Sequence, residues 1–174
     1  MIVFDKFTLP QSIVAGSSDI QIITDDSWGP STINKSTRTI SSKTYNMDIG
    51  NNKLVISNPG IDFDTILLYD YIANGGNTVN LSNLNINMNI SDFNAILQVR
   101  LTLKDVKGSR SVITRQVENN TITWSAIAIR VNGPNLLLNQ IVSIEFKFQM
   151  QILNIPLIVN SITSNVGVLN TCGY

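Results

Sequence analysis

Apolar and neutral polar side chains alternate along several segments of this chain, and this alternation limits the folds that it can adopt. Residues 84–90 read Leu-Asn-Ile-Asn-Met-Asn-Ile, with each apolar residue two positions from the next. A helix would spread these side chains around its axis, whereas a strand collects them on one face. Residues 97–104, 121–131 and 141–152 repeat the pattern. The period of two predicts β-strands with one apolar face and one polar face.

Shorter stretches predict further strands between turn residues. We expect these weaker strands at 2–9, 20–24, 38–49, 53–57, 65–72, 111–117 and 157–168. Turn sequences rich in Asn, Gly and Pro separate them, because Asn and Gly accept the backbone angles of tight reversals. No helix of ten or more residues is predicted. The expected fold class is all-β: a two-sheet antiparallel sandwich, jelly-roll-like, with about ten strands.

The length of the chain suits one folded unit. Its 174 residues show no shift in composition and no repeat of fixed period. We therefore expect a single β-sandwich domain over residues 1–174. Residues 1–16 carry several apolar side chains, including Phe4 and Phe7. We expect this segment to be an N-terminal arm, or a strand exchanged with a neighbouring subunit, rather than an unstructured tail.

The residue types needed for the commonest catalytic chemistries are missing. The chain has no His and a single Cys, Cys172. Nucleophilic triads with a His base, and zinc sites built from Cys and His, are therefore excluded. The glycine-rich phosphate-binding motifs G-x-G-x-x-G and G-x-x-x-x-G-K-S/T are also absent. We predict that the protein is not an enzyme and needs no cofactor.

Carboxylates are the remaining groups that could bind a metal or catalyse a reaction. Asp62 and Asp64 lie two positions apart at the start of a predicted strand, so both point to the same face. Three interpretations stay open: solvated residues at a strand end, which we favour, an oxygen-ligand site for Ca²⁺, and a carboxylate pair for glycoside hydrolysis. If the chain holds a metal ion, we expect Asp62 and Asp64 to be its ligands.

A second candidate site lies in a long irregular loop. Asp25 and Asp26 precede Trp28, which is followed by Gly and Pro. Loops at the ends of a β-sandwich often carry its binding residues. An exposed Trp could stack on a sugar, with further ligand contacts near Asp25 and Asp26. The alternative is that Trp28 anchors the loop to the core.

Basic residues concentrate in one predicted hairpin, where only one acidic residue opposes them. The residues of this basic patch are Arg100, Lys104, Lys107, Arg110 and Arg115. The patch could bind phosphates or an acidic face of a partner, and an ordinary solvated hairpin is the alternative. The hairpin has no aromatic residue, so base stacking is not supported there. Residues 100–115 are the only segment that suggests nucleic-acid binding.

Low charge and neutral polar strand faces favour association between copies of the chain. Charged residues make up 14% of the sequence and the formal net charge is zero, so charge repulsion does not oppose assembly. The leading prediction is a non-enzymatic structural protein that assembles with itself, and with other particle proteins, into a shell or surface layer such as a virus or phage coat. The alternative is a carbohydrate- or receptor-binding β-sandwich module of a larger particle.

The hydropathy pattern bears on where such a particle would form. The N-terminus lacks a basic region followed by a long apolar run, and no stretch of about 18 apolar residues occurs. We expect no signal peptide, no transmembrane segment and no membrane partner. The predicted location is an assembled particle or surface structure made in the cytoplasm.

Overall fold

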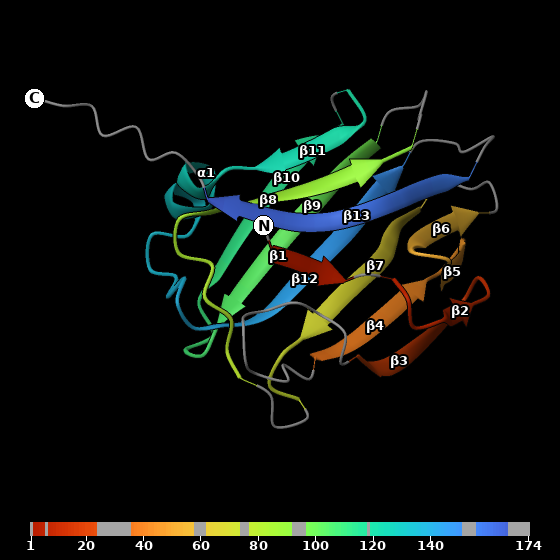
Figure 1. The fold of residues 1–174 in the computed structure, drawn as a ribbon, viewed down its shortest axis with the longest axis horizontal. Coiled ribbons are helices and arrows are strands. Elements are labelled where there is room, and N and C mark those ends of the chain that lie inside the picture. Colours follow the sequence, from red (N-terminus) through yellow and green to blue (C-terminus); the bar gives the residue numbers. More distant parts are fainter. Residues whose placement is uncertain are drawn as a thin grey trace, which may run out of the picture.

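The computed structural model describes residues 2–5, 7–23, 36–57, 62–73, 77–91, 97–117, 119–150 and 156–166. These residues form thirteen strands and one short helix. The strands build two antiparallel sheets that stack face to face, as Figure 1 shows. The predicted fold class, a jelly-roll-like sandwich of two antiparallel sheets, is confirmed. Part of the higher strand count arises because the predicted strand at 38–49 is two strands separated by a turn.

The first sheet has seven strands and includes the N-terminal segment. Its strands are β1 (Ile2–Asp5), β2 (Gln11–Ile13), β5 (Asn46–Gly50), β6 (Lys53–Ser57), β8 (Leu84–Ile90), β11 (Thr121–Trp124) and β13 (Leu157–Val166). Their order is β11-β8-β13-β6-β5-β2, and β1 also pairs with β13. The predicted N-terminal arm therefore pairs with the sheet of its own chain. Its exchange with a neighbouring copy stays a prediction.

The second sheet has six strands and carries the candidate site. Its strands are β3 (Ser17–Ile23), β4 (Ser36–Ser42), β7 (Asp62–Asp70), β9 (Leu97–Asp105), β10 (Arg110–Gln116) and β12 (Ile141–Met150). Their order is β10-β9-β12-β7-β4-β3. The four strands β10, β9, β12 and β7 lie side by side although they come from distant parts of the sequence (Figure 1).

The apolar faces of the two sheets meet in one core. Alternate residues of β8, β9 and β12 are buried, as the period of two predicts. Trp124 of the first sheet packs against Phe146 of the second with ring centroids 5.6 Å apart, and Tyr69 meets the same ring edge-on at 6.5 Å. Aromatic pairs at these separations add to the free energy of burial. Trp124 is therefore a core residue, as its place in the alternation predicts.

Side chains on the neutral polar face of the first sheet form hydrogen bonds with one another across neighbouring strands. The Asn87 side-chain amide donates to the Asn165 side-chain oxygen at 2.9 Å, and the Thr123 hydroxyl donates to the Asn87 side-chain oxygen at 3.0 Å. These bonds run across β8, β13 and β11, which are neighbours in the sheet. Cross-strand pairs of this kind stabilise a sheet without a partner molecule. Asn87 and Asn165 thus have an intramolecular role.

The predicted strand at 121–131 is wrong in its second half, which is the helix α1 (Ala126–Asn132). The Ser125 hydroxyl accepts a hydrogen bond from the Ala128 amide at 3.2 Å. The Asn85 side-chain oxygen accepts one from the first helical amide at 2.9 Å. These acceptors satisfy two N–H groups that a helix start leaves free, so the helix forms although its residues also suit a strand. Within the described residues, no helix has the length and apolar character needed to cross a bilayer.

A charged cluster is buried between the sheets. Arg38 and Asp5 have fully buried side chains, and the Arg38 Nη1 atom lies 2.6 Å from the Asp5 Oδ2 atom. The guanidinium group also donates to the side chains of Gln11 and Gln21 and to a backbone carbonyl. The Tyr69 hydroxyl donates to the same Asp5 oxygen at 3.0 Å. The cluster links β1 of the first sheet to β4 and β7 of the second.

Candidate functional site

The outer face of the six-stranded sheet is organised in rows by the register of its strands. Asp70, Ser143, Lys104 and Arg110 lie opposite one another in one row across β7, β12, β9 and β10. Leu68, Glu145, Thr102 and Val112 form the next row. Antiparallel partners on one face bring their Cβ atoms to about 5 Å. The register therefore places charged side chains from four strands within reach of a single ligand.

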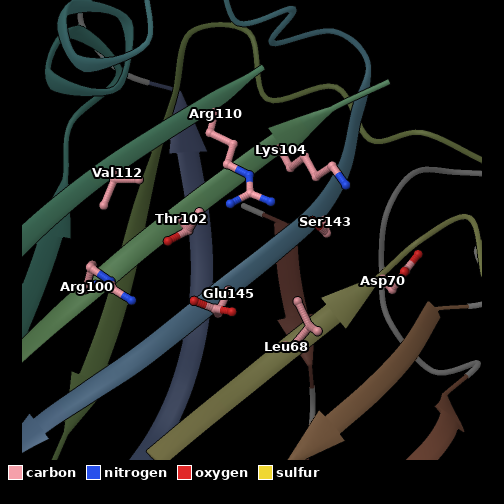
Figure 2. A pocket seen from close by; sticks show the side chains of 9 residues that line it. All are labelled: Leu68, Asp70, Arg100, Thr102, Lys104, Arg110, Val112, Ser143 and Glu145. Carbon is pink, nitrogen blue, oxygen red and sulfur yellow. The ribbon is translucent and has the colours of Figure 1, made fainter. Parts of the chain in front are cut away.

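These two rows, together with Arg100, surround a hollow of about 480 Å³. Its nine lining residues are Leu68, Asp70, Arg100, Thr102, Lys104, Arg110, Val112, Ser143 and Glu145. Figure 2 shows the Arg110 guanidinium reaching from β10 over β9, above Thr102, with Glu145 near the centre of the group. We call this depression the sheet hollow. Seven of its nine lining residues are polar or charged, so it suits a polar ligand.

Most polar side chains of the sheet hollow have no partner within the described protein. Six of them form no hydrogen bond or ion pair with the residues that the structure describes: Arg100, Thr102, Lys104, Arg110, Ser143 and Glu145. The Nε atom of Arg100 is shielded from solvent and also lacks an acceptor. Buried polar atoms are nearly always hydrogen-bonded in folded proteins. The Arg100 side chain also lines the sheet hollow, where a bound molecule can accept hydrogen bonds from the guanidinium group.

Lys147 lies on the same face but is held away from the sheet hollow. Its ammonium group donates to Asp64 Oδ1 at 2.7 Å, and Lys43 lies 2.8 Å from Asp64 Oδ2. The hydrogen bonds from Lys147 and Lys43 lower the pKa of Asp64 to about 2. Asp64 thus stays ionised under ordinary conditions and neutralises charge at this end of the sheet.

This arrangement does not test the predicted cation site at Asp62 and Asp64. The Asp62 side chain lies outside the part of the chain whose side chains are described, and a cation at Asp64 would compete with two ammonium groups. Among the described residues, no three acidic or Cys side chains group together as a metal site requires. Binding of Ca²⁺ by Asp62 and Asp64 stays a prediction.

Two aspartates accept hydrogen bonds from backbone amides at the ends of strands that line the sheet hollow. Asp70 Oδ1 accepts hydrogen bonds from the amides of Ile72 and Ala73, each at 3.0 Å. The Asp105 carboxylate accepts from the amides of Lys107, Ser109 and Leu137. Burial acts to raise the pKa of Asp105, but these amide hydrogen bonds outweigh it and lower the pKa below its usual value. Asp105 therefore holds the β9–β10 turn between Lys104 and Arg110 as a charged acceptor.

The structure divides the basic patch predicted from the sequence. Arg100, Lys104 and Arg110 line the sheet hollow, whereas Lys107 lies in the turn between β9 and β10. Arg115 is exposed near the end of β10, on the face that is buried earlier in the strand. It borders a different depression. Alternation along β10 explains this difference, because residues 110 and 115 are an odd number of positions apart.

The residues that complete the sheet hollow were not singled out from the sequence. Ser143 and Glu145 come from β12, and Leu68 and Asp70 come from β7. Their alternation shows that they face away from the core, but no local pattern shows that β12 pairs with β9. The loop residues Asp25, Asp26 and Trp28, as well as Cys172, lie outside the described residues.

Comparison with known proteins shows similarity at the level of the fold. No family model and no curated protein matches the sequence. The structure of PfGH50B is similar with a TM-score of 0.51 and 12% identity, covering 87% of this chain and 22% of that chain. This chain thus corresponds to about a fifth of that protein.

Two smaller proteins are similar over nearly their whole length, with lower TM-scores. The family 11 carbohydrate-binding module of cellulase Lic26A-Cel5E from Clostridium thermocellum has a TM-score of 0.40 and 14% identity, covering 92% of each chain. The xyloglucanase domain of NopAA, a type three effector from Sinorhizobium fredii, has a TM-score of 0.43 and 12% identity, covering 89% of this chain and 98% of that chain.

These similarities correct two predictions made from the sequence. The similar structures named above include a carbohydrate-binding module and a xyloglucanase domain rather than shell subunits. The leading prediction, a self-assembling virus or phage coat subunit, is contradicted, and so is the prediction that the protein is not an enzyme. Both rested on the absence of familiar motifs and on low charge. A β-sandwich can build a polar site on one sheet face from residues that form no sequence motif.

Proposed function

We propose that this chain is a carbohydrate-binding β-sandwich that takes its ligand in the sheet hollow. The observation that carries the proposal is the set of six polar side chains there that have no partner in the described protein. Strands of the six-stranded sheet fix their backbone positions before a ligand arrives. Preorganised groups lose little conformational entropy on binding.

The mixture of groups in the sheet hollow suits a saccharide. Each sugar hydroxyl can donate one hydrogen bond and accept others. Arg100, Lys104 and Arg110 supply donors, while Glu145 supplies an acceptor. The hydroxyls of Thr102 and Ser143 can do either. Leu68 and Val112 add small apolar surfaces against which the C–H faces of a sugar ring can pack.

The proposal is tested by calorimetric titration of the protein with soluble neutral and acidic polysaccharides. Glu145→Gln removes the charge of the central acceptor, and Thr102→Val removes a hydroxyl while keeping the shape. We expect each variant to weaken binding about tenfold, because Glu145→Gln replaces a charge-assisted hydrogen bond with a neutral one and Thr102→Val removes a hydrogen bond. Gln98→Ala is the matched control, since Gln98 is exposed on β9 but does not line the sheet hollow.

Two results would contradict the proposal. One is the absence of binding to every polysaccharide by the wild-type protein. The other is binding that Glu145→Gln and Thr102→Val leave unchanged, which would place the saccharide elsewhere, for example at the loop of Asp25, Asp26 and Trp28. That loop stays a predicted ligand site.

Glycoside hydrolysis is a second candidate, favoured by the two carboxylates of the sheet hollow. Asp70 and Glu145 occupy diagonal positions on adjacent strands, for which roughly 7–8 Å between residues is usual. Glycosidases use carboxylate pairs about 5–9.5 Å apart. However, Asp70 is engaged by two backbone amides, and Figure 2 shows its carboxylate directed toward the end of β7 rather than toward Glu145. We therefore favour binding over hydrolysis.

A reducing-sugar assay separates the two candidates. Binding without release of reducing ends supports a binding module. Hydrolysis that is lost in both Glu145→Gln and Asp70→Asn, but not in the exposed control Asp48→Asn, would establish the enzyme instead.

A further inference from the structure

The charges of the sheet hollow restrict which saccharides it can accept. Three cationic and two carboxylate side chains line it. Asp70 already shares one oxygen with two backbone amides. Glu145 is then the one lining carboxylate with no partner among the described residues. The three lining cations have no partner among them either. With three cations against two carboxylates, the lining of the sheet hollow carries a net positive charge.

The arrangement of nearby ion pairs preserves this positive charge. Lys147, which follows Glu145 on the outer face of β12, is bonded to Asp64 and so occupies a carboxylate that could otherwise pair with Arg100. Arg100 lies opposite Lys147 in the register but makes no ion pair with Asp64 or Glu145 among the described contacts. Its Nε atom is shielded from solvent without an acceptor. Arg100 lines the sheet hollow, where its guanidinium group can match the paired oxygens of a carboxylate or sulfate group.

The described surface offers no aromatic platform for a neutral sugar. Every aromatic side chain that the structure describes is buried, with at most 1% of its surface exposed: Phe4, Phe7, Tyr45, Tyr69, Tyr71, Trp124, Phe146 and Phe148. Neutral sugars are commonly held by stacking on exposed aromatic rings. Without such a ring in the sheet hollow, ionic hydrogen bonds are the stronger source of affinity.

We infer that the ligand is an anionic saccharide, one that bears carboxylate or sulfate groups between free hydroxyls. Arg100 and Arg110 bind its anionic groups, and Lys104 adds charge at the same edge. Glu145 accepts a hydrogen bond from a hydroxyl, a group that the DNA backbone does not provide. The mixed signs therefore favour a polysaccharide with spaced charges over DNA. This inference rests on the proposed function and names the class of its ligand.

Matched polysaccharide pairs test the inference with the full chain. Dextran sulfate is compared with dextran, and polygalacturonate with its methyl ester, so that each pair shares a backbone and differs in charge. We expect the charged member of at least one pair to bind at least tenfold more tightly at low salt, with the advantage falling as salt rises. The pair that shows the advantage distinguishes sulfate from carboxylate as the bound group.

Charge-removing variants locate the binding. Arg100→Gln and Arg110→Gln should each weaken binding of the charged polysaccharide about tenfold, since each loses an ionic hydrogen bond, and Lys104→Gln should weaken it less. Arg115→Gln is the matched control, because Arg115 is on the same strand as Arg110 but borders another depression. It should change affinity by less than about twofold. Thermal unfolding of each variant verifies that the fold is kept.

Each other outcome overturns a defined part of the reasoning. Equal binding of neutral and charged members, still dependent on Glu145 and Thr102, would refute the anionic ligand and leave the proposed function standing. Binding of none of the polysaccharides would refute both. If Arg115→Gln and Arg110→Gln lowered the affinity equally, the binding would depend on overall surface charge and not on the sheet hollow. Tighter binding of a single-stranded oligonucleotide, weakened by Arg100→Gln, would identify a nucleic-acid site instead.

Discussion

Replacement of Arg38 by Met should destabilise the protein more than any change on the sheet faces. The substitution leaves the Asp5 carboxylate buried and without its cation, and both side chains are fully buried. It also removes the donors to Gln11, Gln21 and the Leu9 carbonyl. Removal of one partner from a buried ion pair typically costs about 3–5 kcal/mol. That loss is a large share of the roughly 5–15 kcal/mol that holds a domain folded.

Urea unfolding followed by circular dichroism measures this loss. We expect the midpoint to fall with little change in the dependence on urea, because the same surface is exposed on unfolding. The double variant Asp5→Leu with Arg38→Met should be less destabilised than the sum of the single variants by about 2 kcal/mol or more, since it leaves no unpaired buried charge. Arg38→Lys keeps the charge without the planar fork and should fall between wild type and Arg38→Met.

The exposed pair of Lys43 and Asp64 is the control for this experiment. The Lys43 side chain is 77% exposed, so Lys43→Met should unfold close to the wild-type midpoint. A loss below about 1 kcal/mol for Arg38→Met, or additive effects in the double variant, would refute the reasoning. Either result would mean that water reaches the Asp5 carboxylate and compensates its charge.

Three further predictions follow from individual contacts. The Asp64 carboxyl should titrate near pH 2, where the hydrogen bonds from Lys147 and Lys43 place its pKa; carbon NMR should show the value rising toward 3.8 in Lys147→Met, and an unchanged value would contradict the pairing. Burial, followed by the nearby Asp5 charge, raises the pKa of Tyr69 well above 10.0. Because unfolded Tyr ionises near pH 10 while folded Tyr69 keeps its proton, the free energy of unfolding should fall as pH rises above about 10, and less steeply in Tyr69→Phe. Ser125→Ala should cost about 1 kcal/mol in urea unfolding by removing the acceptor for the Ala128 amide, whereas the neighbouring exposed Ile127→Ala should cost less.

The two halves of the segment at 121–131 show where local pattern stops being informative. Ile122 and Trp124 are buried alternately in β11, as the period of two predicts. The residues after Ser125 are equally apolar, yet Ala126 and Ile129 are buried at helical spacing in α1. The deciding contacts include the Asn85 side chain, which comes from β8, 41 residues before Ala126. Local alternation could not reveal this contact, because it depends on the pairing of β11 with β8.

For the sheet hollow too, some neighbours could be predicted from the sequence and others depend on the pairing of distant strands. The basic residues of β9 and β10 form a hairpin of neighbouring segments, so their proximity could be predicted from the sequence. Glu145 joins them only because β12 lies between β9 and β7. The prediction of a coat subunit was wrong for a related reason: charge content and missing motifs describe the chain as a whole, whereas a binding site depends on a few side chains that the fold brings together.

By itself, the sequence determined the strand character of the chain and which side chains face the core. Successive side chains of a strand point to opposite faces, so this information is local. Tertiary structure alone decided which strands are neighbours and in what register, because pairing between distant segments depends on how both sheets bury their apolar faces together. It thereby brought Arg100, Glu145 and Asp70 into one hollow and buried Arg38 against Asp5.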